Sequence, residues 1–347
     1  MIKQPTFDHQ KHLSEHDLIA AYFAPLAGVG SFGLRDDAAL FTPSHGSELV
    51  ITTDALIAGV HFFAQDEPAS IARKAMGVNL SDLAAKGAKP CAFVLTLALT
   101  KDQNHDWLQA FSQGLAHMIE VSGCALIGGD TVRTSGPLMI SITMFGEVPT
   151  GKMLKRSGAN QDDYIIVTGT IGDAALGLKL REKNIQNQTH QASHDLSKND
   201  HDFLIDRYLH PQPRLAIREA LLTYATSAMD ISDGLIGDTE KLLHASRIVQ
   251  NMNYGAHIVL PNVPLSHAAH TILNHDPSML EVVVTGGDDY EILCTVPPRD
   301  YESFAKHARL ALVNVTIIGK ITLTGRVIAI DDRGDEKTFS SSAYSHF

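Results

Sequence analysis

The sequence is poor in cysteine and in positive charge, and it has no long apolar run. Its 347 residues include three cysteines, Cys91, Cys124 and Cys294. An odd number of widely spaced cysteines indicates neither a disulfide framework nor a C-x-x-C metal site, and it favours a reducing, cytoplasmic compartment. No run approaches the length that spans a bilayer, and the N-terminal segment lacks the apolar core of a signal peptide. We therefore expect no membrane association.

The deficit of basic residues limits the class of partner. Lys and Arg number 28 against 39 Asp and Glu, which gives a formal net charge of −11. An acidic surface of this kind is unsuited to nucleic acid, so we expect no nucleic-acid partner. A phosphorylated substrate would then need metal ions and a few basic residues to bind its charge.

Several common catalytic motifs are also missing. The sequence has no G-x-x-x-x-G-K-[ST] phosphate loop and no G-x-S-x-G nucleophile, and its 18 histidines include no H-E-x-x-H zinc motif. The segment Gly28–Gly33 (GVGSFG) formally matches G-x-G-x-x-G. A predicted helix precedes it where a dinucleotide-binding turn needs a strand, so we interpret it as a loop.

The chain instead places aspartates beside Gly, Ser and Thr at the ends of its apolar runs. They are Asp36, Asp37, Asp54, Asp82, Asp130, Asp230, Asp233, Asp288 and Asp289. A single aspartate at such a place commonly caps backbone N–H groups, and Asp238 has the same alternative as a helix cap. Burying several carboxylates together, however, is costly without a cation, and carboxylates are the ligands that Mg²⁺ prefers. We therefore predict a site in which loop acids bind metal and phosphate.

Alternating strand and helix patterns predict an α/β fold in two domains. The polar, basic segment GKMLKRSGANQDD marks a boundary that gives domains 1–150 and 151–347. A hairpin is expected from the apolar runs 38–41 and 49–53, and a polar surface insertion from 184–202. Strands are expected on both sides of TGGDDYE.

Helix signals are clearest where a cap or a proline opens the pattern. Helices are predicted over 14–28, 68–87, 105–121, 173–180, 204–224 with a proline break at 210–214, 238–246, 266–273 and 301–312. Further strands are predicted over 91–100, 125–127, 137–148, 164–167, 257–260, 315–318 and 327–330.

The acidic motifs also occur in a recognisable order. They are DDAAL at Asp36, TTD at Asp54 with GVHF after it, VNLSDLAAKGAKP, GGDT, RSGA, MDISDGL and GGDDYE. This series, which covers nearly the whole chain, resembles the thiamine-monophosphate kinase family of the aminoimidazole-ribonucleotide-synthetase-like (PurM-like) ATP-binding superfamily. The ordered set is far more specific than any one of its motifs.

The resemblance implies an α/β (α+β two-domain) fold in a homodimer. The N-terminal mixed-sheet domain would bind ATP and Mg²⁺ and would form a barrel with its dimer partner, and the C-terminal domain would be an α/β sandwich. The implied reaction is direct in-line transfer of the ATP γ-phosphoryl group to thiamine monophosphate, giving thiamine diphosphate and ADP. Several Mg²⁺ ions, with ATP as co-substrate, are part of this expectation.

The resemblance also implies roles for individual residues. The implied magnesium ligands are Asp37, Thr52, Thr53, Asp54, Asp82, Asp130, Asp230 and Asp233. The implied ATP contacts are Gly129, Asp130, Arg156 and Ser232, and the implied thiamine contacts are His61, Asp288 and Tyr344. The residues expected to act in catalysis are Asp54, Asp130, Arg156 and Asp233. Taken alone, His61 is better explained as a packed side chain, Arg156 as a surface charge and Tyr344 as part of a loose C-terminal segment.

The chain departs from the family pattern at Arg35, where glycine is usual, at Asp288, where glutamate is usual, and in the 184–202 insertion.

Other members of the superfamily fit less well. A selenophosphate synthetase would need a nucleophilic cysteine or selenocysteine near the N-terminus, and the first cysteine is Cys91. A maturation protein would present a C-terminal cysteine, and this sequence ends Tyr-Ser-His-Phe. An aminoimidazole ribonucleotide synthetase, or a module that binds metal and nucleotide without turnover, remains an alternative.

Overall fold

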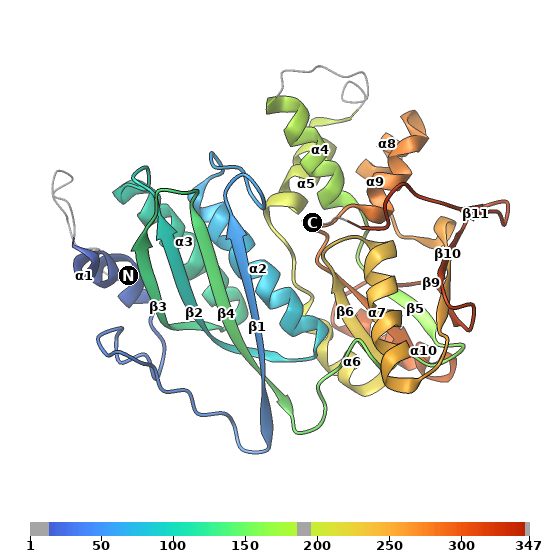
Figure 1. The fold of residues 1–347 in the computed structure, drawn as a ribbon, viewed down its shortest axis with the longest axis horizontal. Helices are drawn as coiled ribbons and strands as arrows, with labels where there is room; N and C mark the ends of the chain where they lie inside the picture. Colours follow the sequence, from blue (N-terminus) through green and yellow to red (C-terminus); the bar gives the residue numbers. More distant parts are fainter. Residues whose placement is uncertain (1–13, 186–195, 344–347) are drawn as a thin grey trace. The chain divides into compact units, whose positions relative to one another are not determined.

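The computed structural model describes residues 14–185 and 196–343, and Figure 1 shows how their elements are arranged. Two separate β-sheets are present, each with helices packed against it. This mixed architecture confirms the predicted α/β fold class, while the dimeric barrel stays a prediction. None of the helices formed by these residues combines the length and the apolar character that a membrane crossing requires.

The chain divides into two compact units. Among the described residues, the first unit comprises 14–83 and 89–151, and the second comprises 84–88, 152–185 and 196–343. The short segment Ala84–Ala88 is tied into the second unit by hydrogen bonds. Lys86 Nζ donates to the Ala228 carbonyl oxygen at 2.8 Å, and the Lys86 carbonyl oxygen accepts from the backbone N–H of Leu154 at 3.3 Å.

The first unit contains a four-stranded sheet in the order β1-β4-β2-β3. Its strands are β1 (Ser47–Ile57), β2 (Lys89–Leu99), β3 (Ala125–Arg133) and β4 (Met139–Pro149). β1 and β2 run antiparallel to β4, whereas β3 is parallel to β2. Helices α2 (Pro68–Ala85) and α3 (His105–Ser122) lie on the same side of this sheet in Figure 1.

Side-chain alternation along β4 explains why one face of this sheet is covered and the other is not. Ile140, Ile142 and Met144 are fully buried, while Ser141 and Thr143 between them remain partly exposed. Successive side chains of a strand point to opposite faces, so the apolar set faces the helices and the polar set faces away from them.

A helical segment precedes the sheet of the first unit. The predicted capping box is confirmed, because Ser14 Oγ accepts from the Asp17 backbone N–H at 3.2 Å and donates to the Asp17 carboxylate at 2.7 Å. The segment consists of α1 (Glu15–Leu18), a π-helical turn (Ile19–Phe23) and a 3₁₀ turn (Ala24–Leu26). It ends where Ala27 pairs with Leu126 of β3.

The second unit is built on a seven-stranded mixed sheet in the order β11-β10-β7-β9-β5-β8-β6. Its strands are β5 (Tyr164–Thr168), β6 (Ser227–Ile231), β7 (Gly255–Val259), β8 (Glu291–Val296), β9 (Val315–Thr322), β10 (Val327–Ile330) and β11 (Glu336–Lys337). Its helices are α4 (Asp173–Ile185), α5 (Lys198–Leu209), α6 (Arg218–Tyr224), α7 (Leu235–Gln250), α8 (His267–His275), α9 (Leu280–Thr285) and α10 (Tyr301–Leu310).

Helices cover both faces of this second sheet. In β5, Ile165 and Val167 belong to the apolar cluster that includes side chains of α4, α7 and α9, while Ile166 belongs to the cluster that includes α6 and α10. A strand buried on both faces has apolar residues at consecutive positions, and the run YIIVT has this character.

Two strand predictions are wrong. Residues 38–41 form no strand and no hairpin with 49–53, which belong to edge strand β1 and pair with β4. The apolar run before TGGDDYE is helix α9, although its three consecutive valines favour a strand. In both cases partners distant in sequence decide the structure, and local patterns do not reveal them.

Two other segments are longer than predicted. β3 continues through Gly128–Arg133, so Gly129 and Asp130 lie within a strand and not after it. Helix α5 begins at Lys198, before the predicted start at residue 204, so the last residues of the predicted insertion 184–202 are helical. Ser197 caps α5 by accepting from the Asp200 backbone N–H. Residues 186–195 of that insertion lie outside the described residues.

Candidate active site

A first group of predicted ligands meets where β1 faces α2. Alternation along β1 places Thr52 and Asp54 on the same face, and Thr52 Oγ1 donates to Asp82 Oδ2 of α2. Thr53 lies on the opposite face of the sheet, where its hydroxyl hydrogen-bonds the Thr143 hydroxyl at 2.9 Å. The structure thus brings together Thr52, Asp54 and Asp82, and it separates Thr53 from them.

The electrostatics of this group suit a cation. Burial, together with the smaller effect of the neighbouring Asp82 carboxylate, raises the pKa of Asp54 to about 6. Carboxylate and hydroxyl oxygens are hard donors of the kind that Mg²⁺ binds, and a bound cation would favour the ionised form of both acids. The donor set therefore fits a divalent cation. Across residues 14–185 and 196–343, however, no three His, Cys, Asp or Glu side chains gather closely enough to form a metal site by themselves.

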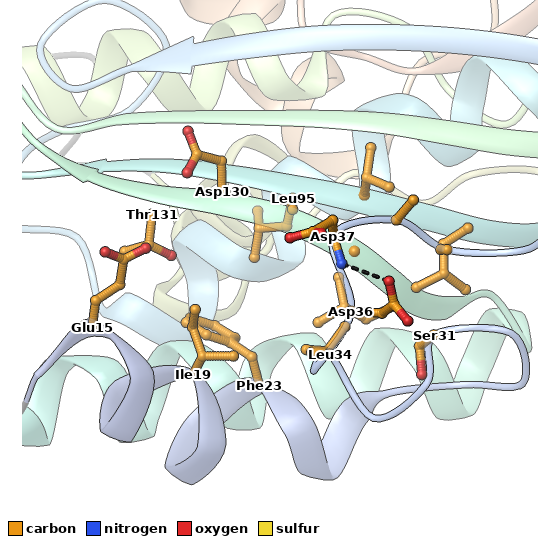
Figure 2. Close-up of a pocket in the computed structure, with 17 residues that line it drawn as sticks. Glu15, Ile19, Phe23, Ser31, Leu34, Asp36, Asp37, Leu95, Asp130 and Thr131 are labelled. Carbon is orange, nitrogen blue, oxygen red and sulfur yellow. Dashed lines mark hydrogen bonds between the residues drawn. The ribbon is translucent and has the colours of Figure 1, made fainter.

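A pocket of about 500 Å³ lies beside β3 in the same unit. Figure 2 shows Ile19 and Phe23 of the N-terminal helical segment on one side of it, and the loop with Asp36 and Asp37 on another. Asp36 Oδ1 accepts from the Asp37 backbone N–H at 2.8 Å, which fixes the loop between the paired acids. Asp130 of β3 also lines the pocket, so three predicted phosphate-site or metal-site acids share it.

Gly129 is required at this place by close backbone packing. A Cβ atom on it would lie 2.0 Å from the Leu95 carbonyl oxygen of β2, a distance that no side chain can adopt. The glycine therefore lets β2 and β3 approach closely under the pocket. The predicted ATP contact at Gly129 is thus placed beside Asp130, on a rigid strand.

In the second unit the predicted residues gather where β6 ends. Asp230 is almost fully buried within β6, and Ser232 to Gly234 form the turn into α7. Asp238 Oδ2 accepts from three consecutive backbone N–H groups, those of Ser232, Asp233 and Gly234, at 3.0, 2.9 and 3.2 Å. This buried carboxylate fixes the turn that carries the predicted ligands. Asp238 therefore does stabilise the start of α7, but it does so from within the helix and not from the N-cap position, which Gly234 occupies.

A lysine completes this cluster, and the sequence analysis did not identify it. Lys241 Nζ donates to Asp238 Oδ1 at 2.7 Å and also to Asp233 Oδ2. Burial raises the pKa of Asp238, and the hydrogen bond from Lys241 offsets part of this rise. Burial lowers the pKa of Lys241, but the two carboxylates outweigh this effect and raise it overall. The three-residue spacing of Asp238 and Lys241 was the available signal.

The predicted substrate residue Asp288 lies on a second loop, which packs directly on the first. The Asp288 backbone N–H donates to the Ser232 carbonyl oxygen at 2.9 Å, and that of Tyr290 donates to the Ile231 carbonyl oxygen at 2.8 Å. Asp288 has a φ of 72° and Tyr290 a φ of 51°, a region that non-glycine residues rarely adopt. Tyr290 Oη donates to Asp288 Oδ1 at 3.2 Å. The two loops thus form one hydrogen-bonded unit with Asp288 beside Ser232.

A buried ion-pair network supports the base of this second loop. The fully buried Glu291 accepts from Arg207 Nη2 at 2.8 Å, from Arg214 Nε at 2.6 Å and from Thr168 Oγ1 at 2.6 Å. Its neighbour Asp289 accepts from the Gly172 backbone N–H at 2.7 Å, and burial raises its pKa well above the usual range. Sequence reasoning missed this network, although charged residues in otherwise apolar surroundings were a signal for it.

Three predicted residues lie apart from these groups or outside the described residues. His61 Nδ1 accepts from the Ile57 backbone N–H at 3.0 Å, so the ring proton is placed on Nε2 when the imidazole is neutral. Arg156 is exposed, and its carbonyl oxygen accepts from Ser246 Oγ at 3.2 Å. Tyr344 lies outside the described residues.

Comparison with known proteins agrees with this arrangement. Residues 35–148 match the family model of the AIR synthase related protein, N-terminal domain, and residues 160–332 match that of the C-terminal domain. The two units with their acidic loops therefore define a member of the AIR synthase related class.

Closer relatives narrow the class. Thiamine-monophosphate kinase of Escherichia coli (strain K12) is 39% identical over 337 residues, which cover 96% of this chain and 98% of that protein. The crystal structure of thiamine-monophosphate kinase from Stenotrophomonas maltophilia K279a has a TM-score of 0.77 and 35% identity, and covers 88% of this chain and 92% of its own. The chain belongs to the thiamine-monophosphate kinase family. A further relative, AaThiL complexed with AMPPCP and TMP, has a TM-score of 0.73 and 27% identity, with 88% of this chain and 89% of that chain covered.

Proposed function

We propose that the chain transfers the γ-phosphoryl group of ATP to thiamine monophosphate, giving thiamine diphosphate and ADP. The observation that carries the proposal is the set of acids that the structure collects in a family member: Asp54 and Asp82 with Thr52, and Asp37 with Asp130 in one pocket. The relative bound to AMPPCP and TMP supports both substrates.

Phosphoryl transfer to this acceptor does not require a general base. The acceptor is a phosphate monoester whose second pKa is about 6, so it is already largely a dianion at neutral pH. The barrier comes mainly from bringing two polyanions into line. Mg²⁺ ions bound by the predicted aspartates would neutralise this charge and orient the phosphates. The protein's part is to hold the acids on rigid elements, as β1, α2 and β3 do in the first unit and the Asp238-fixed turn does in the second.

We also propose a homodimer formed through the uncovered face of the first unit's sheet. On edge strand β1, Leu49 and Ile51 are 37% and 60% exposed, and they stand on the face opposite α2 and α3, which no helix among residues 14–83 and 89–151 covers. Exposed apolar side chains on an open sheet face are typical of an interface. The three cysteines are free thiols, which suits the cytoplasmic location that we propose.

The test is product formation from ATP, Mg²⁺ and thiamine monophosphate, with thiamine or no acceptor as negative controls. We expect equal amounts of ADP and thiamine diphosphate, formed only with the monophosphate. Asp54→Asn should lower kcat by about 100-fold or more, because charge stabilisation by a bound metal is worth several kcal/mol.

The matched control is Asp102→Asn, an exposed acid of the same unit that we place outside the site. It should leave turnover unchanged. ATP binding without acceptor-dependent ADP release would contradict the proposal and favour a nucleotide-binding module on this fold. Full activity of Asp54→Asn would show instead that the metal assignment is wrong.

A further inference from the structure

The ammonium group of Lys241 is shared between two carboxylates of unequal freedom. The Asp238 side chain is fully buried, and its other oxygen is bound by three backbone N–H groups. The Asp233 side chain is 37% exposed, and the hydrogen bond it makes among the described residues is the one from Lys241. Asp238 is therefore fixed, whereas the position of the Asp233 carboxylate depends on Lys241.

We propose that Lys241 is a tethered counter-ion that competes with a divalent cation for the Asp233 carboxylate. The inference rests on the proposed role of Asp233 as a cation ligand and adds a residue that controls that ligand. It concerns how readily the carboxylate becomes available, not which reaction follows.

The competition follows from geometry. The ammonium is bonded to Asp233 Oδ2, and a Mg²⁺ ion would bind the same oxygen at about 2.1 Å. Both cations cannot lie at hydrogen-bond or coordination distance from one oxygen without strong mutual repulsion. Cation binding at that oxygen is therefore weakened while Lys241 stays bonded to it, and movement of Lys241 away from it relieves the repulsion.

The displacement is easy because Lys241 keeps its other partner. Its ammonium is a compact charge on a flexible stem of four carbons, with three donors that rotate freely. It can release Asp233 while still donating to Asp238 Oδ1, which leaves no buried carboxylate oxygen without a partner. The ion pair with Asp233 is partly exposed, and such pairs are weak. We therefore expect Lys241 to reduce cation affinity at Asp233 modestly, by about twofold to fivefold.

The experiment measures cation binding by the full-length protein without nucleotide. Free Mn²⁺ is followed by electron paramagnetic resonance, and Mg²⁺ is then added as a competitor. In Lys241→Gln the amide still offers a donor to Asp238 but carries no charge, so the dissociation constant should fall by about twofold to fivefold. Lys241→Arg keeps the charge and should resemble the wild type.

The matched control is Lys306→Met on α10, an exposed lysine of the same unit. It removes the same net charge, so any change that it shares with Lys241→Gln reflects the overall field and not competition. Lys241→Met serves as a second variant, and thermal unfolding verifies that each protein is folded. If either folded variant binds Mn²⁺ no more tightly than Lys306→Met, the inference is overturned.

Asp233→Asn separates this inference from the role of Asp233 itself. It should weaken Mn²⁺ binding, and in this background Lys241→Gln should have no further effect. If Asp233→Asn leaves Mn²⁺ binding unchanged, the cation role of Asp233 is wrong and the inference fails with it. If Asp233→Asn weakens binding but the effect of Lys241→Gln persists in the double variant, Lys241 acts on another ligand and the inference alone is overturned.

Discussion

Asp54 carries a conflict between stability and function. Its pKa is raised from 3.8 to about 6 by burial and by Asp82, so the folded protein favours the neutral carboxyl. Well below pH 3.8 the group is protonated in both the folded and the unfolded states, and the raised pKa does not affect stability. As the pH rises from about 3.8 to about 6, the unfolded state releases a proton that the folded state keeps, so the free energy of unfolding falls, and above pH 6 this loss is complete.

Replacing Asp54 by Asn should therefore stabilise the metal-free protein at neutral pH and should also remove activity. The free energy of unfolding should rise by up to about 3 kcal/mol at pH 8 and should hardly change at pH 4. Urea unfolding at pH 4 to 8, beside Asp102→Asn, measures this. Equal stability of Asp54→Asn and the wild type at pH 8 would mean that the Asp54 carboxyl ionises without penalty.

Residue contacts were the part of the site that the sequence predicted least completely. The sequence predicted a strand that ends beside Asp54 and a helix that contains Asp82, but it could not show that Thr52 bonds Asp82. Lys241 was not identified from the sequence: its three-residue spacing from Asp238 was a local signal, whereas its bond to Asp233 depends on the turn that Asp238 fixes.

Among the elements, strand β8 begins with a charged residue that is buried in the core. Glu291 is the first residue of β8 and has no exposed side-chain surface, and Arg207 and Arg214 converge on it from α5 and the segment after it. A carboxylate with two guanidinium partners and a hydroxyl donor is well satisfied. Removing its charge would leave two arginines, one of them almost fully buried, without compensation.

Glu291→Gln should accordingly destabilise the protein by about 3 to 5 kcal/mol, because it breaks a buried ion pair from one side. In a unit of this size each kcal/mol lowers the melting temperature by about 2 to 4 °C. Differential scanning calorimetry measures the shift, with the exposed Glu302→Gln on α10 as the control. A decrease below about 1 kcal/mol would show that the network contributes little to stability.

Elements with signals inside their own sequence were predicted correctly. α2 begins with a proline and is followed by a glycine of positive φ, and α3 follows a capping Asn104 and ends at Gly123. The hairpin expected at 38–53 is wrong, since residues 38–41 form no strand and edge strand β1 pairs instead with β4, about ninety residues away. The strand expected before TGGDDYE is wrong because this segment forms α9, whose valines are buried against α4 and α7, where a helix fits.

At the scale of the whole molecule, the uncovered sheet face should decide the oligomeric state. Ile51→Glu introduces a charge into the proposed interface, where burying it without a partner is costly. We expect the wild type to be a dimer by light scattering coupled to size exclusion, and the variant to dissociate at least about 100-fold more readily. The control is Val249→Glu on α7, which is 68% exposed in the second unit.

Either of two results would contradict this expectation. A monomeric wild type would show that the exposed face of β1 has another use. A dimeric Ile51→Glu would place the interface elsewhere on the molecule.

The segment Ala84–Ala88 has a consequence for any attempt to express the second unit by itself. A gene beginning at residue 152 would omit Ala84 and Ala85, which are fully buried in the apolar cluster with Leu221 and Ile292. It would also leave the Ala228 carbonyl oxygen without its Lys86 donor. Such a fragment would have a gap in its apolar core, and a soluble version would need residues Ala84–Ala88 joined back to it through a linker. In the full-length chain these five residues are synthesised before the rest of the second unit, so they are already present when that unit folds.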